Sequence, residues 1–516
     1  ALNQRDTSLS KWKRVADVWC APWFGAPGTV VPASAFGALS DAILNDAGML
    51  PATTADALLQ AAAAIADSRR LFHWELEFPE VFFAADGTRL PDAGFDAVIG
   101  NPPWDMIRAD AGSAEGRASS RTAASSLLRF TRDSGAYAAQ SDGHANRYQL
   151  FLERSIALTK PGGRIGMVLP GGLATDQGSA ALRRMLLSQC NVDAVVGFDN
   201  QQAVFPIHRS VRFLLLTAAR GEPTRTIACR LGERDPASLD AIGEEPADSS
   251  PWFTVRVTPA LLQQLSGDSL AIPDLRGPID VAILERAAAL FAPLGSEEGW
   301  NARFGRELNA TSDGRHFGPP GGGLPVVEGK QIEPFRVDLP AVRFSVPAHQ
   351  AARLLDPVRY GRGRLAYRDV ASATNRLTLI AALLPAGCVS THTVFCLRTP
   401  LPPLDQEFLC GLFNSFVLNY FVRLRVSTHV TTAVVERLPV PGRPHRPRGF
   451  REITALARRL ARRHDEEAYA RLQALVAGMY QMSVEEFEHV LGTFPLVPPE
   501  TRARALRAFA TETRGA

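Results

Sequence analysis

The chain has 516 residues, of which 46% are hydrophobic and 21% charged, and a formal net charge of +3. This length predicts roughly two to four domains, because a single compact core rarely grows so large. No apolar run reaches the roughly 20 residues needed to cross a bilayer, and no signal peptide is apparent, so we expect a cytoplasmic protein. Six scattered cysteines without a CxxC pair argue against a disulfide framework or zinc ribbon, and we predict reduced cysteines and no metal site.

The first half of the chain predicts helices followed by an α/β run. Residues 9–70 contain Ala-rich stretches and are predicted to be helical. The apolar segment FDAVIG predicts a strand over 95–100, and the polar, weakly periodic residues 109–145 predict a mobile loop or insertion. Further on, the pattern predicts helices over 148–159 and 178–189 and strands over 164–169, 192–198 and 210–217. This alternation is typical of an α/β sheet with short connections.

The second half begins with a polar, Pro- and Asp-rich segment that predicts a linker or peripheral region. Between 324 and 440 the sequence predicts a mixed α/β region, with strands in LPVVEGK, RLAYRDVA and CVSTHTVFCL and a buried helix over 408–425. The remaining residues are predicted to be helical. Residues 443–467 concentrate Arg and His, which indicates either a phosphate-contacting surface or a solvated helix face.

The strand over 95–100 leads directly into Asn101-Pro102-Pro103-Trp104. Ligands of open α/β sheets bind beyond the carboxyl ends of the strands, so chemistry is expected at this loop. The prolines fix the backbone and present carbonyl acceptors, Asn101 adds an amide oxygen, and Trp104 offers a flat stacking surface. This set of groups suits a planar substrate that carries an exocyclic amino group.

An amine conjugated to a ring is a poor nucleophile because its lone pair is delocalised. Two acceptors that hold its N–H groups favour the tetrahedral geometry in which the lone pair attacks a methyl donor in line. Catalysis would then arise from positioning and from stabilisation of the developing positive charge.

The motif Asn101-Pro102-Pro103-Trp104 resembles the catalytic loop of S-adenosylmethionine-dependent amino methyltransferases, chiefly adenine-N6 DNA methylases. RYQLFLERSIALTKPGGRIGMVLP resembles the segment that follows this loop in the family, and AVFPIHRSVRFLLLT resembles a later motif. The resemblance implies catalytic roles for Asn101 to Trp104, with Asn101 also near the cofactor, and a place for Phe151 in the cofactor's adenine pocket. It implies stacking of an extruded base between Trp104 and Phe205, and Tyr148 is a weaker cofactor candidate for which packing is the main alternative.

Later segments, among them YRDVASATNRLTLIAALLP and LFNSFVLNYFVRLR, resemble the target-recognition half of type IIG (Eco57I-like) enzymes and of phage-defence (BREX or DISARM) methylases. This implies double-stranded DNA as partner, other defence subunits as further partners, and no membrane. Residues chemically suited to phosphates or base edges in this region are Lys330, Arg368, Asn375, Arg376, Thr428, His429 and Thr431.

The resemblance implies an α/β fold: a Rossmann-like methyltransferase sheet, incomplete at its N-terminal side, then a mixed α/β target-recognition domain and C-terminal helices. The expected parts are a helical segment (1–70), part of the catalytic core (71–225), a linker (226–300), the recognition domain (301–440) and a helical region (441–516).

One family feature is missing from the sequence. These methylases hold the methionine end of S-adenosylmethionine at a Gly-rich loop after their first strand, and neither FGAPGTV, GPPGGG nor KPGGRIG fits that pattern. We therefore expect the chain to be the C-terminal part of a longer polypeptide, and to be inactive or to bind the cofactor weakly on its own.

Three alternatives follow from the same residues. A non-catalytic DNA-recognition or scaffold protein would explain the missing loop, and a protein glutamine methylase would share the Asn-Pro-Pro-aromatic motif. Cytosine-C5 methylation needs a nucleophilic Cys after Pro, whereas Cys190 follows Gln and Cys388 follows Gly. The chain also contains no convincing Asp…Glu-x-Lys nuclease site.

Overall fold

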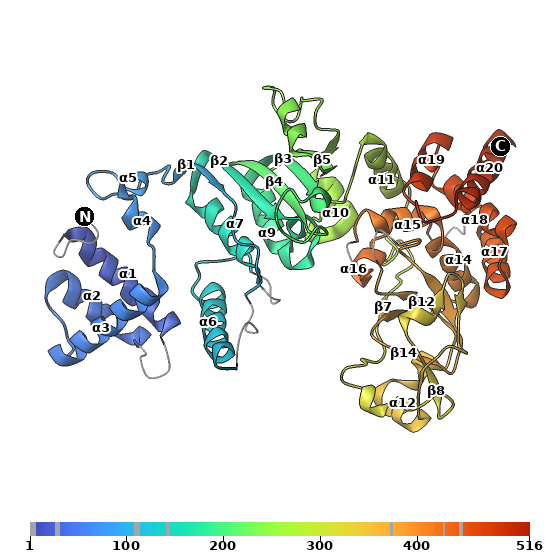
Figure 1. Cartoon of the computed structure of the whole chain (residues 1–516), viewed down its shortest axis with the longest axis horizontal. Helices are drawn as coiled ribbons and strands as arrows, with labels where there is room; N and C mark the ends of the chain where they lie inside the picture. The colour runs from blue at the N-terminus through green and yellow to red at the C-terminus, as the bar shows by residue number, and fades with distance from the viewer. Residues whose placement is uncertain are drawn as a thin grey trace. The chain divides into compact units, whose positions relative to one another are not determined.

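The computed structural model describes residues 7–25, 31–107, 114–140, 145–371, 375–426, 429–442 and 447–515. The chain divides into two compact units (Figure 1). Unit 1 comprises Ala1–Cys229 and Glu233–Ser250, and unit 2 comprises Arg230–Gly232 and Pro251–Ala516. The boundary falls within the segment expected to link the catalytic core to the recognition domain, and the finer division into five parts stays a prediction.

Unit 1 begins with helices and continues as an α/β sheet. Its helices are α1 (Ser8–Phe24), α2 (Phe36–Asn45), α3 (Ala52–Arg69), α4 (Trp74–Glu77), α5 (Pro79–Phe82), α6 (Ala114–Asp133), α7 (Arg147–Leu158), α8 (Gly172–Thr175) and α9 (Ala180–Gln189). Its strands are β1 (Phe95–Gly100), β2 (Thr159–Pro170), β3 (Cys190–Asp199), β4 (Arg212–Arg220) and β5 (Ile227–Glu233). Short 3₁₀ turns η1 (Ala33–Ala35), η2 (Gln177–Ser179), η3 (Asn200–Gln202) and η4 (Pro236–Ala241) join them.

The strands of unit 1 lie in the order β1-β2-β4-β3-β5. β1 is parallel to β2, with Val98 opposite Ile165, whereas β4 is antiparallel to both β2 and β3. Helix α7 packs against β2, and α9 packs against β3 (Figure 1). This arrangement confirms the predicted α/β sheet.

Two predictions for unit 1 need correction. Residues 114–133, expected to lie in a loop, form helix α6, which is fixed because the Phe130 ring packs 5.2 Å from that of Phe24 and the Arg129 guanidinium donates to the Pro22 and Trp23 carbonyls. The strand predicted over 164–169 begins earlier, at Thr159, so the Pro-Gly-Gly stretch lies inside β2, where Gly162 adopts a φ of 78° that a side chain would strain.

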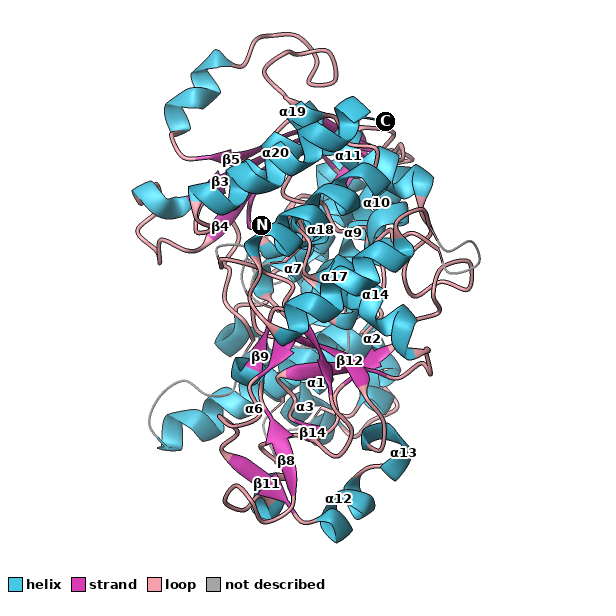
Figure 2. Cartoon of the chain, turned by 90° about the vertical axis from the view of Figure 1, so that its right-hand side faces the viewer, coloured by secondary structure: helices cyan, strands magenta, loops and turns pink. Residues whose placement is uncertain are grey.

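Unit 2 combines small sheets with a helical region (Figure 2). Its strands are β6 (Val255–Val257), β7 (Phe304–Gly305), β8 (Leu324–Val327), β9 (Ile332–Glu333), β10 (Arg336–Val337), β11 (Phe344–Val346), β12 (Arg364–Arg368), β13 (Ala381–Leu384), β14 (Val389–Ser390) and β15 (Val394–Leu397). Its helices are α10 (Pro259–Ser266), α11 (Pro278–Leu290), α12 (Ala348–Leu354), α13 (Pro357–Tyr360), α14 (Pro403–Phe413), α15 (Phe416–Arg423), α16 (Thr432–Val435), α17 (Phe450–Arg462), α18 (Glu466–Met479), α19 (Val484–Gly492) and α20 (Pro499–Gly515). Short 3₁₀ turns are η5 (Gly267–Ser269), η6 (Gly314–His316) and η7 (Gly329–Gln331).

Within unit 2, β13, β12, β15 and β7 form one sheet in that order, and β11, β8 and β14 form another. Helix α14 packs on β12 and β13 and also contacts α17, which in turn contacts α18. The predicted strands and C-terminal helices are therefore confirmed, and the predicted linker contains the helices α10 and α11. Among the described residues, no helix is long and apolar enough to span a membrane.

Candidate functional site

The Asn-Pro-Pro-Trp loop leaves the end of β1 and is tied to the start of α7. The Ile107 N–H donates to the Ala145 carbonyl at 3.0 Å, and the Arg147 N–H donates to the Asp105 carbonyl at 3.0 Å. Asn146 is the N-cap of α7, and its backbone N–H donates to the Gln149 Oε1 at 3.0 Å. The loop is thus held at both ends, by a sheet strand and by a capped helix.

The four residues of the loop differ in exposure. Pro102 is buried, Pro103 and Trp104 are half-buried, and Asn101 is exposed. The Asn101 amide makes no hydrogen bond to any described residue, so both its oxygen and its nitrogen are available to a ligand. The catalytic role of Asn101 stays a prediction.

Trp104 belongs to an aromatic cluster that contains Phe205. The Trp104 ring centroid lies 6.1 Å from that of Phe205 and 6.3 Å from that of Phe213. Phe213 in turn stacks on Phe198, with centroids 5.0 Å apart and planes inclined by 4°. The structure therefore brings together the two residues predicted to stack on a base, although 100 residues separate them in the chain.

These two rings meet edge to face, with an angle of 79° between their planes. A flat base held between two parallel rings needs about 7 Å between the planes, because each aromatic contact takes about 3.5 Å. The observed pair leaves no such gap, so a stacked base requires one ring to turn. The Trp104 Nε1 is also buried with no hydrogen-bond partner among the described residues.

The two predicted cofactor residues on α7 point to different surroundings. Phe151 is 51% exposed, so its ring is available to line a cofactor pocket, and this role stays a prediction. Tyr148 is buried, and its hydroxyl lies 2.9 Å from the Ser179 hydroxyl. Burial also raises the pKa of Tyr148. The packing role, which the sequence left open for Tyr148, fits these contacts.

β1 lies at one end of the sheet, and no described strand pairs with its outer edge. Parallel strands are normally buried on both faces, yet Ile99 of β1 is 86% exposed. Asp96 is also exposed and forms an ion pair with Lys160 at 2.7 Å, which lowers the pKa of its carboxyl. The outer edge of β1 is therefore open, that is, not paired with any described strand, and it lies next to the candidate catalytic loop.

In unit 2, several of the predicted DNA-contacting residues gather beside the end of β12. A cavity of about 320 Å³ is lined by Lys330 and Arg368 together with Glu328, Gly329, Val370 and Thr393. His429 joins this group, because its backbone forms a bridge with Val370. Lys330 and His429 are exposed, as a nucleic-acid contact requires. We refer to Lys330, Arg368 and His429 as the basic cluster.

Two residues that the sequence analysis did not single out organise the basic cluster. The buried Asp369 carboxylate pairs with the Arg306 guanidinium at 2.7 Å and faces the His429 Nδ1 at 3.4 Å. Arg306 also lies over the Phe395 ring, 4.8 Å from its centroid. The sequence signal for Asp369 was its place between Arg368 and an apolar residue at the end of a strand, which alone does not indicate a partner.

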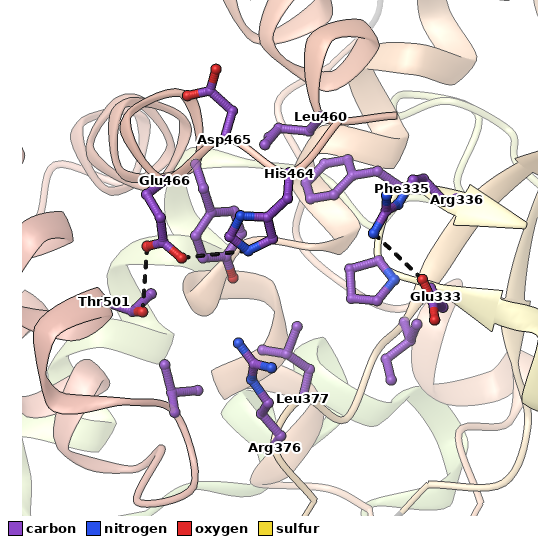
Figure 3. Close-up of a pocket in the computed structure, with 14 residues that line it drawn as sticks. Glu333, Phe335, Arg336, Arg376, Leu377, Leu460, His464, Asp465, Glu466 and Thr501 are labelled. Carbon is purple, nitrogen blue, oxygen red and sulfur yellow. Dashed lines mark hydrogen bonds and ion pairs between the residues drawn. The ribbon is translucent and has the colours of Figure 1, made fainter. Parts of the chain in front are cut away.

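The remaining predicted residues lie elsewhere in unit 2. Arg376 lines a second cavity of about 320 Å³, which has both charged and apolar lining residues and includes residues of β9, β10, α18 and α20 (Figure 3). Asn375 is exposed next to Arg376, and its carbonyl accepts a hydrogen bond from Arg423. Thr431 is exposed at the N-cap of α16, and Thr428 lies outside the described residues.

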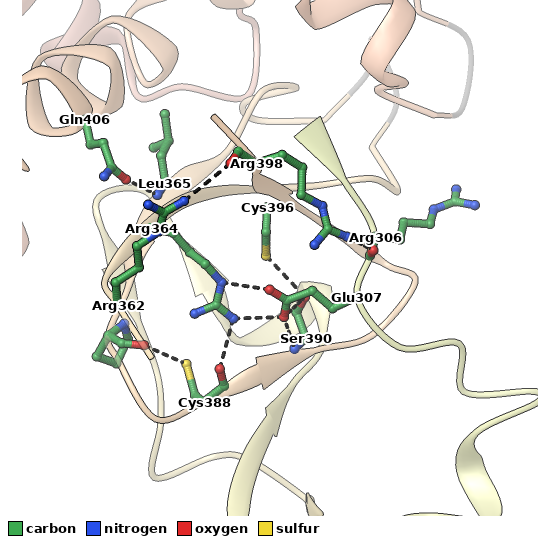
Figure 4. A network of polar contacts seen from close by, with 11 residues as sticks. Arg306, Glu307, Arg362, Arg364, Leu365, Cys388, Ser390, Cys396, Arg398 and Gln406 are labelled. Atoms are coloured by element: carbon green, nitrogen blue, oxygen red, sulfur yellow. Dashed lines mark hydrogen bonds and ion pairs between the residues drawn. The ribbon is translucent and has the colours of Figure 1, made fainter. Parts of the chain in front are cut away.

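A buried ion pair holds β12 in place. Arg364 is fully buried, and its Nε and Nη2 donate to the two carboxylate oxygens of Glu307 at 2.8 Å each (Figure 4). Glu307 also accepts from the backbone N–H of Ser390 at 2.8 Å. Removing one partner of such a pair costs several kcal/mol, so this contact ties β12 to the segments that follow β7 and carry β14.

All six cysteines are buried and none forms a disulfide. Burial raises the pKa of Cys190 to about 11 and that of Cys229 to about 12. A thiolate nucleophile is therefore strongly disfavoured, in agreement with the sequence argument against cytosine-C5 chemistry.

Part of the chain is similar to a known protein family. Residues 37–205 match the family model of the Eco57I restriction-modification methylases. The matched segment contains β1, the Asn101 to Trp104 loop, Phe151 and Phe205, and the match confirms the resemblance found in the sequence. No curated protein sequence matches the chain.

Solved structures similar to the chain include two restriction-modification enzymes. The type IIL enzyme MmeI, solved in complex with DNA, has 12% identity and a TM-score of 0.41 over 90% of this chain and 65% of its own. The type IIG restriction endonuclease BpuSI has 12% identity and a TM-score of 0.31 over 98% of this chain and 66% of its own. The chain thus spans about two thirds of the length of these enzymes.

Proposed function

We propose that this chain, together with a segment that supplies a Gly-rich cofactor loop, transfers a methyl group from S-adenosylmethionine to N6 of an adenine extruded from duplex DNA, within a restriction-modification or phage-defence system. The observation that carries the proposal is the exposed Asn101 amide at the end of β1, which makes no hydrogen bond to any described residue, together with the Trp104 and Phe205 rings, whose centroids lie 6.1 Å apart. The family match over the same residues supports it.

In the proposed reaction, the Asn101 oxygen and the Pro102 carbonyl accept hydrogen bonds from the adenine amino group, which strengthen as that nitrogen becomes positively charged. S-adenosylmethionine would supply the electrophilic methyl group and leave as its neutral thioether, and the methylated amino group would then lose one proton. Trp104 and Phe205 stack on the base and offset part of the few kcal/mol that extrusion costs. The basic cluster of unit 2 contacts phosphates or base edges of the flanking duplex.

The cofactor's adenine end would lie against Phe151, whose exposed ring suits this contact. For the methionine end we propose that a Gly-rich loop is supplied by a segment that pairs with the open edge of β1. Measurable methyl transfer to DNA by the isolated 516-residue chain would contradict this part of the proposal.

The test of the catalytic role is Asn101→Ala in the full-length protein, assayed with radiolabelled S-adenosylmethionine and unmethylated genomic DNA. We expect loss of methylation by at least about 100-fold, because one acceptor of the reacting amine is removed. DNA affinity, measured by fluorescence anisotropy, should stay within about twofold, because phosphate contacts dominate affinity. Asn45→Ala, which removes an exposed amide of α2, is the matched control. Retained activity in Asn101→Ala would refute the role.

The same assay tests two other functions. A non-catalytic scaffold would bind DNA and show no methyl transfer even in the full-length protein. A protein glutamine methylase would label protein and leave DNA unlabelled. Digestion of labelled DNA to nucleosides, followed by mass spectrometry, would distinguish N6-methyladenine from every other methylated base.

A further inference from the structure

The side chain of Asn200 is buried at the junction between β3 and the loop that carries Phe205. Only 1% of this residue is exposed. Its position is fixed by the sheet, because the preceding Asp199 pairs in register with Arg212 of β4 and forms an ion pair with it at 2.9 Å. A buried amide is costly unless its hydrogen-bonding groups find partners, so its contacts show what it is for.

Those contacts converge on the backbone of Phe205. The Asn200 Oδ1 accepts from the Phe205 N–H at 2.9 Å, and the Asn200 Nδ2 donates to the Phe205 carbonyl at 3.1 Å. Longer contacts run from the same Nδ2 to the Ile207 carbonyl at 3.4 Å and the His208 carbonyl at 3.5 Å. One side chain therefore clamps both backbone polar groups of a single residue.

The Phe205 ring packs edge to face on Phe213, with centroids 4.8 Å apart, but the backbone of the loop has few hydrogen bonds apart from those to Asn200. Residues 203–211 contain no helix or strand, and within them the Ile207 N–H donates to the Phe205 carbonyl at 2.8 Å. Ala203, which enters the loop, adopts a φ of 57°, a conformation unfavourable for a residue with a side chain. The Phe205 ring itself is only half-buried.

We propose that Asn200 is a positioning residue for base binding. By holding the backbone of Phe205, it fixes the point from which the Phe205 side chain extends, and the ring of this side chain forms one wall of the base site. The Phe205 ring can then turn about its side-chain bonds to admit the base, while its backbone stays in place. This inference rests on the proposed function for the identity of the ligand, an extruded adenine, but not for the clamp itself.

A clamp of this kind acts through preorganisation. A stacking ring on a loose loop loses conformational entropy when the base binds, and this loss subtracts from the stacking energy. With the backbone fixed beforehand, only the rotation of the ring remains to be ordered. Removal of Asn200 should therefore weaken capture of the extruded base while leaving the contacts of unit 2 with duplex DNA unchanged.

The first experiment follows the ring itself in the full 516-residue chain. 4-Fluorophenylalanine placed at position 205 should give one ¹⁹F resonance shifted from its position in unfolded protein, because the Trp104 and Phe213 rings lie beside it. In Asn200→Ala and Asn200→Asp this shift should shrink or the line should broaden. Gln201→Ala, which removes an exposed amide from the same 3₁₀ turn, should leave the signal unchanged.

An unchanged ¹⁹F signal in folded Asn200→Ala would overturn the proposal. So would failure of both Asn200 variants to fold, checked by thermal unfolding, because Asn200 would then be a core residue and not a positioning residue. Asn200→Asp keeps the size of the side chain and the acceptor for the Phe205 N–H, and it lacks the donor to the Phe205 carbonyl.

The second experiment compares binding to a fully paired duplex and to the same duplex with one bulged, unpaired adenine. The unaltered chain should prefer the bulged duplex, and Asn200→Ala should lose roughly tenfold of that preference, on the scale of one base–aromatic stack. If the unaltered chain shows no preference while the ¹⁹F signal still depends on Asn200, the proposed function fails and the clamp stands. If the preference survives in Asn200→Ala, the clamp has no role in base capture.

Discussion

At the scale of single residues, Asp369 shows how one buried carboxylate arranges several cations. Its side chain is 3% exposed, and it holds Arg306 at 2.7 Å while it faces His429. Lys330 and Arg368 lie around the adjoining cavity and do not pair with Asp369. Lys330 instead lies 3.5 Å from Glu328, a weak and largely solvated contact. Within the basic cluster, Lys330 is thus the side chain that can leave its partner for a phosphate most easily.

We predict that Lys330→Gln weakens DNA binding by the chain and lowers the slope of log affinity against log salt concentration by about one, because one phosphate contact is lost. The measurement is fluorescence anisotropy with a labelled duplex over a range of salt concentrations. Arg353→Gln removes an exposed cation of α12 and should change neither quantity. An unaltered slope in Lys330→Gln would show that this side chain does not contact the DNA backbone.

At the scale of secondary-structure elements, Asp280 joins three helices of unit 2. It lies in the first turn of α11, accepts a hydrogen bond from the Tyr420 hydroxyl of α15, and faces the His489 Nε2 of α19 at 2.6 Å. Burial raises the pKa of Asp280, but the hydrogen bonds from His489 and Tyr420 outweigh this effect, and the pKa is lowered overall. The ionised carboxylate is therefore the form that the folded protein stabilises.

This direction fixes the expected pH dependence. A carboxyl whose pKa is lower in the folded than in the unfolded state adds stability above its unfolded pKa, and that stability is lost as the pH falls through the folded pKa. The free energy of unfolding of unit 2 should therefore decrease as the pH falls below about 5. Asp280→Asn should lower stability by about 2 kcal/mol at neutral pH and flatten this decrease.

The measurement is urea unfolding followed by circular dichroism at several pH values. Glu488→Gln, which changes an exposed carboxylate on α19, is the control and should keep the original pH dependence. An identical acid slope in Asp280→Asn and the unaltered chain would assign the loss of stability to other carboxyl groups.

Elements with strong periodicity or a clear motif could be predicted from the sequence, and those that depend on distant partners could not. β1 was expected over 95–100 and occurs at Phe95–Gly100, because an apolar run that ends in Gly-Asn-Pro-Pro leaves few alternatives. The helix expected over 408–425 is broken into α14 and α15, since Asn414 donates to the Ala381 carbonyl and Asn419 accepts from the Thr378 N–H. Two buried amides thus bind a neighbouring strand and loop, which no local pattern indicates.

The candidate site divides in the same way. Asn101 to Trp104 could be located from the motif, and Phe205 from the family resemblance. The role of Asn200 could not be predicted from the sequence, because it arises from hydrogen bonds between its side chain and the backbone of Phe205. Asp369 and Arg306 were missed for the same reason, since 63 residues separate the two partners of the ion pair.

At the scale of the whole molecule, the two units separate the candidate chemistry from the candidate DNA contacts. Asn101, Trp104, Phe151 and Phe205 belong to unit 1, and the basic cluster belongs to unit 2. Asn101→Ala should accordingly lower methylation without weakening duplex binding, whereas Lys330→Gln should weaken duplex binding and lower methylation only at DNA concentrations below saturation. Loss of methylation by Lys330→Gln at saturating DNA would contradict this separation.

The open edge of β1 also has a consequence for how the chain behaves during folding. A bare strand edge beside an exposed Ile99 can pair with any free strand, including another copy of itself. The charges of Asp96 and Lys160 lie on this strand and its neighbour, where they oppose such pairing only in part. We predict that the 516-residue chain self-associates as its concentration rises and that Ile99→Lys reduces this association in sedimentation velocity. Equal association of the unaltered chain and Ile99→Lys would mean that the edge of β1 does not cause self-association. If Ile99→Lys associates less, a partner strand must pair with β1 soon after synthesis to keep the protein from aggregating.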